Sequence, residues 1–183
     1  EPNFLQDQQL LDNELLRAVS EGNSYTLSKN LELGANINAV DKMKNNAAHI
    51  ASTRGYLDIL RYLDKKKFNF NAKNINGFTP LHQAVMNKQN EAIKYLAKIS
   101  DINAPDFGGW TALHWAARNH DAISAFLLLI NGANINAVDK KGNTALHWAV
   151  QNYADEVFDI LMDFNANDVI PNNDGFTASH IEK

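Results

Sequence analysis

The chain has 183 residues, of which 45% are hydrophobic and 21% charged, a composition that supports a folded core and excludes a disordered segment. It contains no cysteine, which excludes disulfides, cysteine-containing zinc sites and thiol nucleophiles. The formal net charge of −4 argues against nucleic-acid binding, which needs many basic side chains to neutralise phosphates.

The charge is unevenly distributed along the chain. Residues 40–73 carry eight Lys or Arg against three acids, whereas residues 139–183 carry three against eight, so the two ends of the molecule are expected to differ in sign. The longest apolar run, residues 125–130, is far shorter than the roughly 18–20 residues of a membrane helix. We therefore expect no direct membrane insertion and an intracellular, cytoplasmic protein. Because the chain starts at Glu1 without Met, we also expect it to be part of a longer protein.

The first predicted element is an amphipathic helix near the N-terminus. Its apolar side is formed by Leu10, Leu11, Leu15 and Leu16, and polar residues cover the other side. This pattern is typical of a capping unit with a polar outer face.

A motif then recurs at spacings of 33, 32, 33 and 33 residues. Columns of alanine (Ala18, Ala51, Ala84, Ala116, Ala149) and leucine (Leu63, Leu96, Leu128, Leu161) keep the same register. This self-similarity predicts a stack of similar units, each too small to bury its apolar surface alone. The copies of the motif are Asn46-Ala-Ala-His49, Thr79-Pro-Leu-His82, Thr111-Ala-Leu-His114, Thr144-Ala-Leu-His147 and Thr177-Ala-Ser-His180.

Each unit carries the signals of a turn followed by two helices. Asp106 and Asp139 open four-residue turns that end in glycine, which is the preference of a type I turn. The threonine of the motif stands where a hydroxyl caps the next helix, so the first helix is expected to begin there. The second helix ends at residues that tolerate the left-handed conformation (Gly34, Gly132, Asn165), and Lys67 is a worse fit at that place.

These units resemble ankyrin repeats, whose pattern runs Asp-x-x-Gly-x-Thr-Pro-Leu-His-x-Ala, a second helix, Gly-Ala and a hairpin. The resemblance covers essentially the whole chain. It implies an all-α solenoid of helix-turn-helix units joined by β-hairpin loops. The expected domain is a single one over residues 1–183, with units at 1–40, 41–73, 74–105, 106–138, 139–171 and a partial sixth unit at 172–183.

Two places depart from the repeat pattern. In the second unit Asn46 replaces the threonine and the turn at residues 41–44 lacks its glycine, while the link from Lys98 to Ala104 is one residue short. We expect the second unit and the hairpin at residues 99–106 to be the most irregular parts of the stack.

Five of the six histidines occupy the same position of successive units. Neighbouring units lie roughly 10 Å apart, so these imidazoles cannot share a metal ion whose ligand nitrogens must lie about 2 Å away. Each is expected to hydrogen-bond backbone in or near the adjoining hairpin. His120 lies outside the column and is interpreted as a surface residue, the alternative being a partner contact.

No catalytic, cofactor-binding or metal-binding residue is predicted. The sequence has no glycine-rich phosphate loop and no nucleophile motif. The acidic run Asp155, Glu156, Asp159 and Asp163 is interpreted as a solvated helix face rather than a cation site. The basic run at 65–67 is interpreted as a solvated helix end, the alternative being a contact with an acidic partner or phospholipid.

The resemblance places partner contacts on the hairpin tips and on the concave face of the first helices. Among the candidates, Phe78, Met86, Phe107, Trp110 and Trp115 are expected to lie close together. The alternative is that these aromatic residues pack between neighbouring units. The full candidate set is Lys42, Met43, Arg54, Ile75, Phe78, Met86, Phe107, Trp110, Trp115, Arg118, Asn119, Lys141 and Trp148.

One asparagine recurs in the hairpin of successive units. Asn38, Asn71, Asn103 and Asn136 resemble the hairpin asparagine that intracellular asparaginyl hydroxylases modify in ankyrin proteins. Hydroxylation is therefore one hypothesis for this column. The alternative is that asparagine simply suits the turn through its side-chain hydrogen bonds.

The predicted function is a non-catalytic interaction module, an adaptor or scaffold, that binds a protein or peptide. It is expected to be monomeric unless its open C-terminal face associates. The 25 asparagines indicate an AT-rich coding sequence, which favours an effector of an intracellular microbe acting in a host cytosol. The alternative is a recruiting or regulatory arm of a larger enzyme. The Leu-His-Trp-Ala segments at 113–116 and 146–149 are similar to those of ankyrin-bearing protein acyltransferases.

Overall fold

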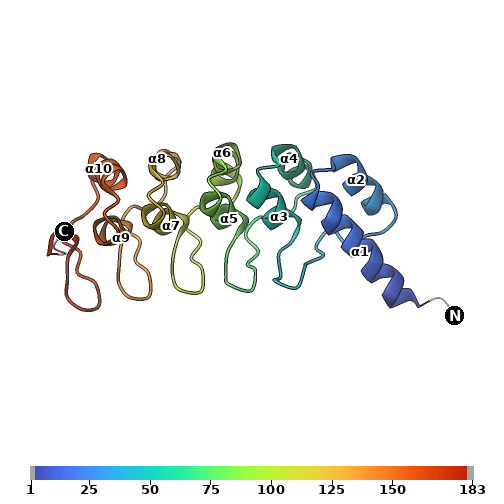
Figure 1. The fold of residues 1–183 in the computed structure, drawn as a ribbon, viewed down its shortest axis with the longest axis horizontal. Coiled ribbons are helices and arrows are strands. Elements are labelled where there is room, and N and C mark those ends of the chain that lie inside the picture. The colour runs from blue at the N-terminus through green and yellow to red at the C-terminus, as the bar shows by residue number, and fades with distance from the viewer. Residues whose placement is uncertain (1–2, 181–183) are drawn as a thin grey trace.

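A computed structural model describes residues 3–180, which form ten α-helices and one short 3-10 helix. The helices stack in pairs along one axis, with the two ends of the chain at opposite ends of the stack (Figure 1). The all-α solenoid is confirmed. The helices are α1 (Phe4–Ser20), α2 (Ser24–Glu32), α3 (Ala47–Arg54), α4 (Leu57–Lys65), α5 (Pro80–Met86), α6 (Asn90–Ile99), α7 (Ala112–Arg118), α8 (Ala122–Ile130), α9 (Ala145–Gln151), α10 (Asp155–Asp163) and the 3-10 helix η1 (Ala178–His180).

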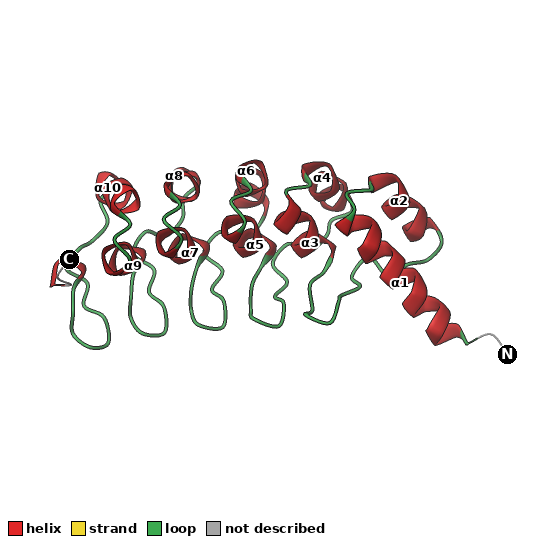
Figure 2. Cartoon of the chain, viewed as in Figure 1, coloured by secondary structure: helices red, strands yellow, loops and turns green. Residues whose placement is uncertain are grey.

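The helix pairs form two layers, and hairpin-shaped loops extend from one side of them; the tips of these loops are called the fingers. The second helices (α2, α4, α6, α8, α10) make the outer layer, and the first helices (α3, α5, α7, α9) make the inner layer next to the fingers (Figure 2). Within residues 3–180 no strand is assigned, so the predicted β-hairpins are loops with a hairpin shape. Backbone hydrogen bonds close these loops near their tips. In the loop at residues 106–110, the Asp106 N–H donates to the Trp110 carbonyl at 2.8 Å, and the Gly109 N–H donates to the Asp106 carbonyl at 3.0 Å. The fingers are the tips at residues 41–45, 74–78, 106–110, 139–143 and 172–176.

The core lies between the layers and follows the repeat columns. The alanines and leucines of those columns are almost fully buried, as Ala116 and Leu128 at 0% exposure illustrate. Small side chains let adjacent inner helices approach closely, while the leucines fill the space beneath the outer helices. No helix of residues 3–180 has the length and apolar character that a bilayer crossing demands.

The motif residues cap the inner helices as predicted. The hydroxyls of Thr79 and Thr144 accept the backbone N–H of His82 and His147, three residues further on. The second unit is more regular than expected, because the Asn46 side chain makes the same cap and Lys44 adopts the positive φ (59°) of the missing glycine. An irregularity does occur at the short link, where α6 ends in the extended residue Ser100 instead of a left-handed one.

The N-terminal helix corrects one expectation. Leu15 and Leu16 are buried, but Leu10 is 58% exposed and Phe4 and Leu5 are each 84% exposed. With 17 residues α1 is about twice as long as its neighbours α2 and α3. Its N-terminal half therefore extends past the stack (Figure 1), while Gln8 and Asp12 still form hydrogen bonds with the loop that follows α2. The three last residues of the partial sixth unit, 181–183, lie outside the described residues.

Four histidines of the column bridge successive repeats. In His114, the ring atom Nε2 donates to the Asn143 carbonyl of the next finger at 2.9 Å, while Nδ1 accepts the backbone N–H of Thr111 at 3.0 Å. His49, His82 and His147 make the same pair of bonds, with Nε2 at 2.7–2.9 Å from the carbonyls of Phe78, Trp110 and Phe176. The prediction that this column hydrogen-bonds the adjoining hairpin is confirmed for these four. The fifth member, His180, is exposed, and its ring forms a hydrogen bond with Thr177 of its own unit at 2.8 Å.

The bridge fixes the protonation state of the ring. A carbonyl partner requires a proton on Nε2, and a backbone N–H partner requires a free lone pair on Nδ1, so the folded protein needs a neutral imidazole. Burial accordingly lowers the pKa of His49, His82 and His114 below the ordinary histidine value, and the bonds to carbonyl groups offset only part of this effect.

Replacing His114 should destabilise the stack far more than replacing His180. The His114→Ala variant leaves the buried Thr111 N–H and Asn143 carbonyl without partners, which should lower the free energy of unfolding by about 2–4 kcal/mol. The matched His180→Ala change removes an exposed ring of the same column and should cost less than about 0.5 kcal/mol. Urea unfolding followed by circular dichroism measures both, and equal losses would contradict the bridging role.

Stability should also fall on mild acidification. Unfolded histidines take up a proton as the pH falls through about 6.5, whereas His49, His82 and His114 have lowered pKa values in the folded state. The stabilisation is thus complete above that pH and declines below it. Urea unfolding at a series of pH values should give a shallower decline for His82→Gln than for the wild type. His120→Gln, a change at an exposed ring outside the column, is the matched control, and an unaltered slope in His82→Gln would refute the explanation.

Candidate partner-binding surface

An aromatic shelf runs across three repeats on the finger side of the stack. Its members are Phe78 and Trp110 at the ends of two fingers, Trp115 on α7 and Trp148 on α9, all half-buried. Ring centroids lie 5.5 Å apart for Phe78 and Trp115, 5.0 Å for Trp110 and Trp115, and 4.3 Å for Trp110 and Trp148. The four rings thus form one surface that spans repeats three to five.

Two buried carboxylates hold the shelf in place. The indole N–H of Trp115 donates to Asp106 at 3.0 Å, and the indole N–H of Trp148 donates to Asp139 at 2.8 Å. The other oxygen of Asp106 accepts two N–H groups of its own finger, from Gly108 at 2.8 Å and Trp110 at 2.9 Å. Because each carboxylate binds both its finger and a tryptophan of the following helix, the rings are fixed relative to the fingers before any partner arrives.

A cation lies on top of the shelf. The guanidinium of Arg118, an exposed side chain at the end of α7, is 5.7 Å from the Trp110 ring centre and 5.5 Å from that of Trp115. Stacking on two rings restrains this side chain without using its hydrogen-bond donors. Among residues 3–180, no carboxylate forms an ion pair with Arg118.

The predicted aromatic cluster is only partly correct. Phe78, Trp110 and Trp115 come together as expected, and Trp148 joins them although it was not expected in the cluster. Phe107 lies at its finger tip instead, 57% exposed, with its ring against Gly77 and the Lys73 ammonium 6.0 Å away. The Phe107 ring therefore lies against the preceding finger, whereas the Trp110 ring contacts Trp115 and Trp148.

The remaining predicted contact residues lie on the fingers and near the ends of inner helices in repeats two to five. Met43, on the first finger, and Ile75, on the finger that ends at Phe78, are exposed at 48% and 47%. Lys42, Arg54 and Lys141 are exposed, and Met86 and Asn119 are half-buried at the ends of α5 and α7. Their role in binding stays a prediction.

The recurring asparagines form a ladder between repeats. The side-chain oxygens of Asn71, Asn103 and Asn136 accept a backbone N–H from the following repeat at 2.7, 2.7 and 2.9 Å. Asn38, the first member of the column, is exposed. This bonding gives the column a structural reason, and hydroxylation of any of the four stays a prediction.

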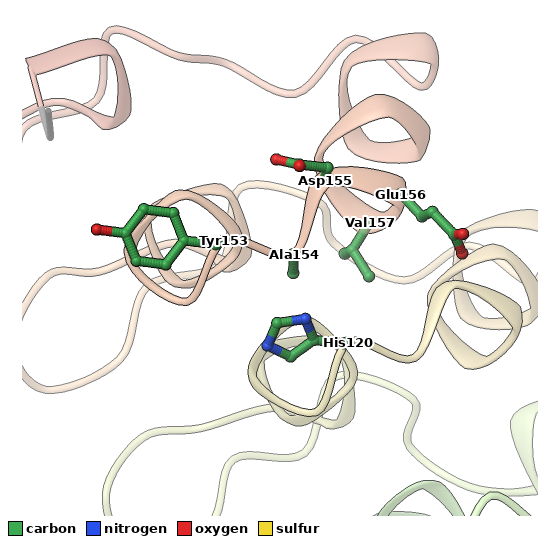
Figure 3. A pocket seen from close by; sticks show the side chains of 6 residues that line it. All are labelled: His120, Tyr153, Ala154, Asp155, Glu156 and Val157. Carbon is green, nitrogen blue, oxygen red and sulfur yellow. The ribbon is translucent and has the colours of Figure 1, made fainter. Parts of the chain in front are cut away.

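A separate hollow lies between repeats four and five. It has a volume of about 320 Å³ and is lined by His120, Tyr153, Ala154, Asp155, Glu156 and Val157. The His120 ring faces the turn that precedes α10 (Figure 3). Within the described part of the chain, no three His, Asp or Glu side chains are grouped as metal ligands would be. His120 is an exposed turn residue with φ 54°, in agreement with its interpretation as a surface residue.

The fold and this surface define a repeat solenoid that presents side chains from its fingers and inner helices. A family model described as "Ankyrin repeats (3 copies)" matches residues 15–106, 68–139 and 113–181, three overlapping stretches that together cover most of the chain. The chain belongs to the ankyrin-repeat family. Repeats of this family are non-catalytic protein–protein interaction modules.

Curated relatives are similar to this chain over part of its length. Inversin of Canis lupus familiaris is 30% identical over 107 residues, which is 57% of this chain and 10% of that protein. A Caenorhabditis elegans homolog of transient receptor potential cation channel subfamily A member 1 is 34% identical over 122 residues, or 65% of this chain and 9% of the channel. Human neurogenic locus notch homolog protein 2 is 35% identical over 108 residues, or 57% of this chain and 4% of that protein.

Removing the carboxylate that supports the shelf should loosen it. The Asp106→Ala variant leaves the Trp115 indole and two finger N–H groups without their acceptor, and we expect a loss of about 1–3 kcal/mol in the free energy of unfolding. Asp174→Ala, a change at the exposed tip of the last finger, should have little effect. Urea denaturation with tryptophan fluorescence checks both variants, since all three tryptophans lie in the shelf. Equal stability of the two variants would contradict this role of Asp106.

Proposed function

We propose that this chain binds a protein segment that places an apolar side chain on the aromatic shelf and a carboxylate on Arg118. The observation that carries the proposal is the Arg118 guanidinium, stacked on Trp110 and Trp115 yet without an ion pair in the described chain. A restrained guanidinium beside apolar rings binds a carboxylate with little further loss of side-chain entropy.

The charge of the neighbouring fingers supports an acidic partner. Lys42 and Lys44 on the first finger and Lys140 and Lys141 on the fourth are exposed cations. Asp106 and Asp139, which would oppose such a partner, are buried and occupied by finger N–H groups and tryptophans. The surface that surrounds the shelf therefore attracts negative charge, which favours both the encounter rate and the selection of acidic segments.

The same surface serves a free-standing adaptor or the recruiting arm of a larger protein. The matched segments make up 10% or less of the three relatives described above, so repeats of this kind occur as parts of long chains. Recruitment for an enzyme encoded elsewhere in the same protein, such as a protein acyltransferase, is the alternative form of the proposal. An effector role in a host cytosol is a more specific form, and its support is the asparagine-rich composition.

Affinity capture from eukaryotic cell lysate tests the proposal in its first step. The bait is this chain beside two variants, Arg118→Ala and Trp110→Ala, and the matched control is Tyr153→Ala, an exposed aromatic residue away from the shelf. A partner of the proposed kind should be retained by the wild type and the control and lost from both shelf variants, with all four baits melting at similar temperatures.

Titration of the captured protein then gives the affinity. Because every tryptophan of the chain lies in the shelf, partner binding should change the tryptophan emission directly. Arg118→Ala should weaken binding about 10-fold or more, which corresponds to the value of a good charged contact at an interface. Equal affinity of the wild type and both shelf variants would overturn the proposal.

A further inference from the structure

The outer helix α8 differs from the other outer helices because it carries no charged residue. Ile123, Phe126 and Ile130 are 58%, 44% and 53% exposed, and their spacing of three and four residues places them on one side of the helix. The Phe126 ring also contacts Phe164, 37% exposed, at a centroid distance of 6.0 Å. The result is an apolar stripe on α8, a helix of the outer layer, which lies on the side of the stack opposite the fingers (Figure 1).

Charges of opposite sign flank this stripe at equivalent positions. The buried leucines Leu96 on α6, Leu128 on α8 and Leu161 on α10 are equivalent. Two residues before and two residues after this leucine, α6 has Lys94 and Lys98, and α10 has Asp159 and Asp163. All four side chains are exposed. At the same two positions α8 has Phe126 and Ile130. From one repeat to the next, the outer layer therefore changes from basic to apolar to acidic.

We propose that a second copy of this chain covers the stripe in a two-fold symmetric dimer. If the symmetry axis runs parallel to α8 between the two copies, the stacks point in opposite directions and the apolar stripes meet. The α10 helix of each copy then lies over α6 of the other, with Asp159 opposite Lys94 and Asp163 opposite Lys98. Symmetry repeats each pair, so one arrangement forms four ion pairs around an apolar centre.

The order of charges favours a second copy over an unrelated partner. A surface that changes from basic to apolar to acidic is complementary to itself when reversed, a property that binding to a different protein does not require. The whole chain has the same polarity, with five excess positive charges at residues 40–73 and five excess negative charges at residues 139–183. Five residues before the buried leucine, Glu156 of one copy would face Glu91 of the other. Glu91, however, is paired with Lys94 of its own helix at 2.6 Å.

Such a dimer would be weak and sensitive to salt. Exposed ion pairs contribute little each, and the attraction between them is screened at high ionic strength. The monomer expected from the sequence would then be the main species only in dilute solution. Dimerisation through the outer layer leaves both aromatic shelves free, on the two far sides of the assembly, and would make the molecule bivalent for its partner.

Sedimentation velocity over a concentration series tests the dimer. The wild type should rise from 20.4 kDa toward twice that mass, and added salt should shift this rise to higher concentration. Phe126→Glu should remain monomeric. Two charge reversals, Lys94→Glu with Lys98→Glu and Asp159→Lys with Asp163→Lys, should each abolish the rise when studied alone. Circular dichroism should show the same melting temperature for all variants, since every changed residue is exposed.

Mixing the two charge-reversed chains provides the decisive outcome. In an equal mixture, the acidic α6 of one chain faces the basic α10 of the other, and the remaining wild-type α10 and α6 also attract. The mixture should therefore recover the dimer that neither chain forms alone. A wild type that stays monomeric at every concentration, a dimer unaffected by the reversals, or a mixture that stays monomeric would overturn the proposal.

Discussion

The buried imidazoles of the histidine column each hold two hydrogen bonds that belong to different repeats. One bond closes the start of an inner helix, and the other reaches a backbone carbonyl of the following finger. Both partners are backbone groups that are largely shielded from water. Removing the ring would therefore leave a buried N–H and a buried carbonyl without a hydrogen bond. The helices, the fingers and the spacing between repeats all depend on this bridge, and it operates only while the ring is neutral.

The bridges determine which side chains remain free for other contacts. Asp106 and Asp139 likewise join the fingers to the tryptophans of the following helices. Each carboxylate accepts hydrogen bonds from backbone N–H groups of its finger and from one indole N–H. These backbone and indole N–H groups thus find their acceptors inside the stack. Arg118 on the finger side and the apolar stripe of α8 on the outer side are not required for this frame, which is why we assign them to binding.

The sequence predicted the frame well and its surfaces less well. The repeat register, the helix caps and the bridging histidines follow from backbone requirements that every unit shares, so the pattern of residues was sufficient. The stacking of Trp148 on Trp110 was missed because it depends on side-chain conformations in two different repeats. The exposure of Leu10 was missed because it depends on the length of α1 relative to its neighbours.

The outer layer shows the same difficulty. From the sequence, the acids of residues 155–163 fit an ordinary solvated helix face, and no pattern related them to Lys94 and Lys98. Only the position of Lys94, Phe126 and Asp159 at one level of successive outer helices relates these charges to the apolar stripe between them.

Native-state hydrogen exchange in low concentrations of denaturant tests the coupling between repeats most directly. If the imidazole bridges join the repeats, the amides of Thr79, Thr111 and Thr144, which donate to the rings, should exchange with one common opening free energy. The amides in the overhanging half of α1 should exchange much faster. Separate opening free energies for these three threonines, each following its own repeat, would contradict the conclusion that the bridges make the stack a single cooperative unit.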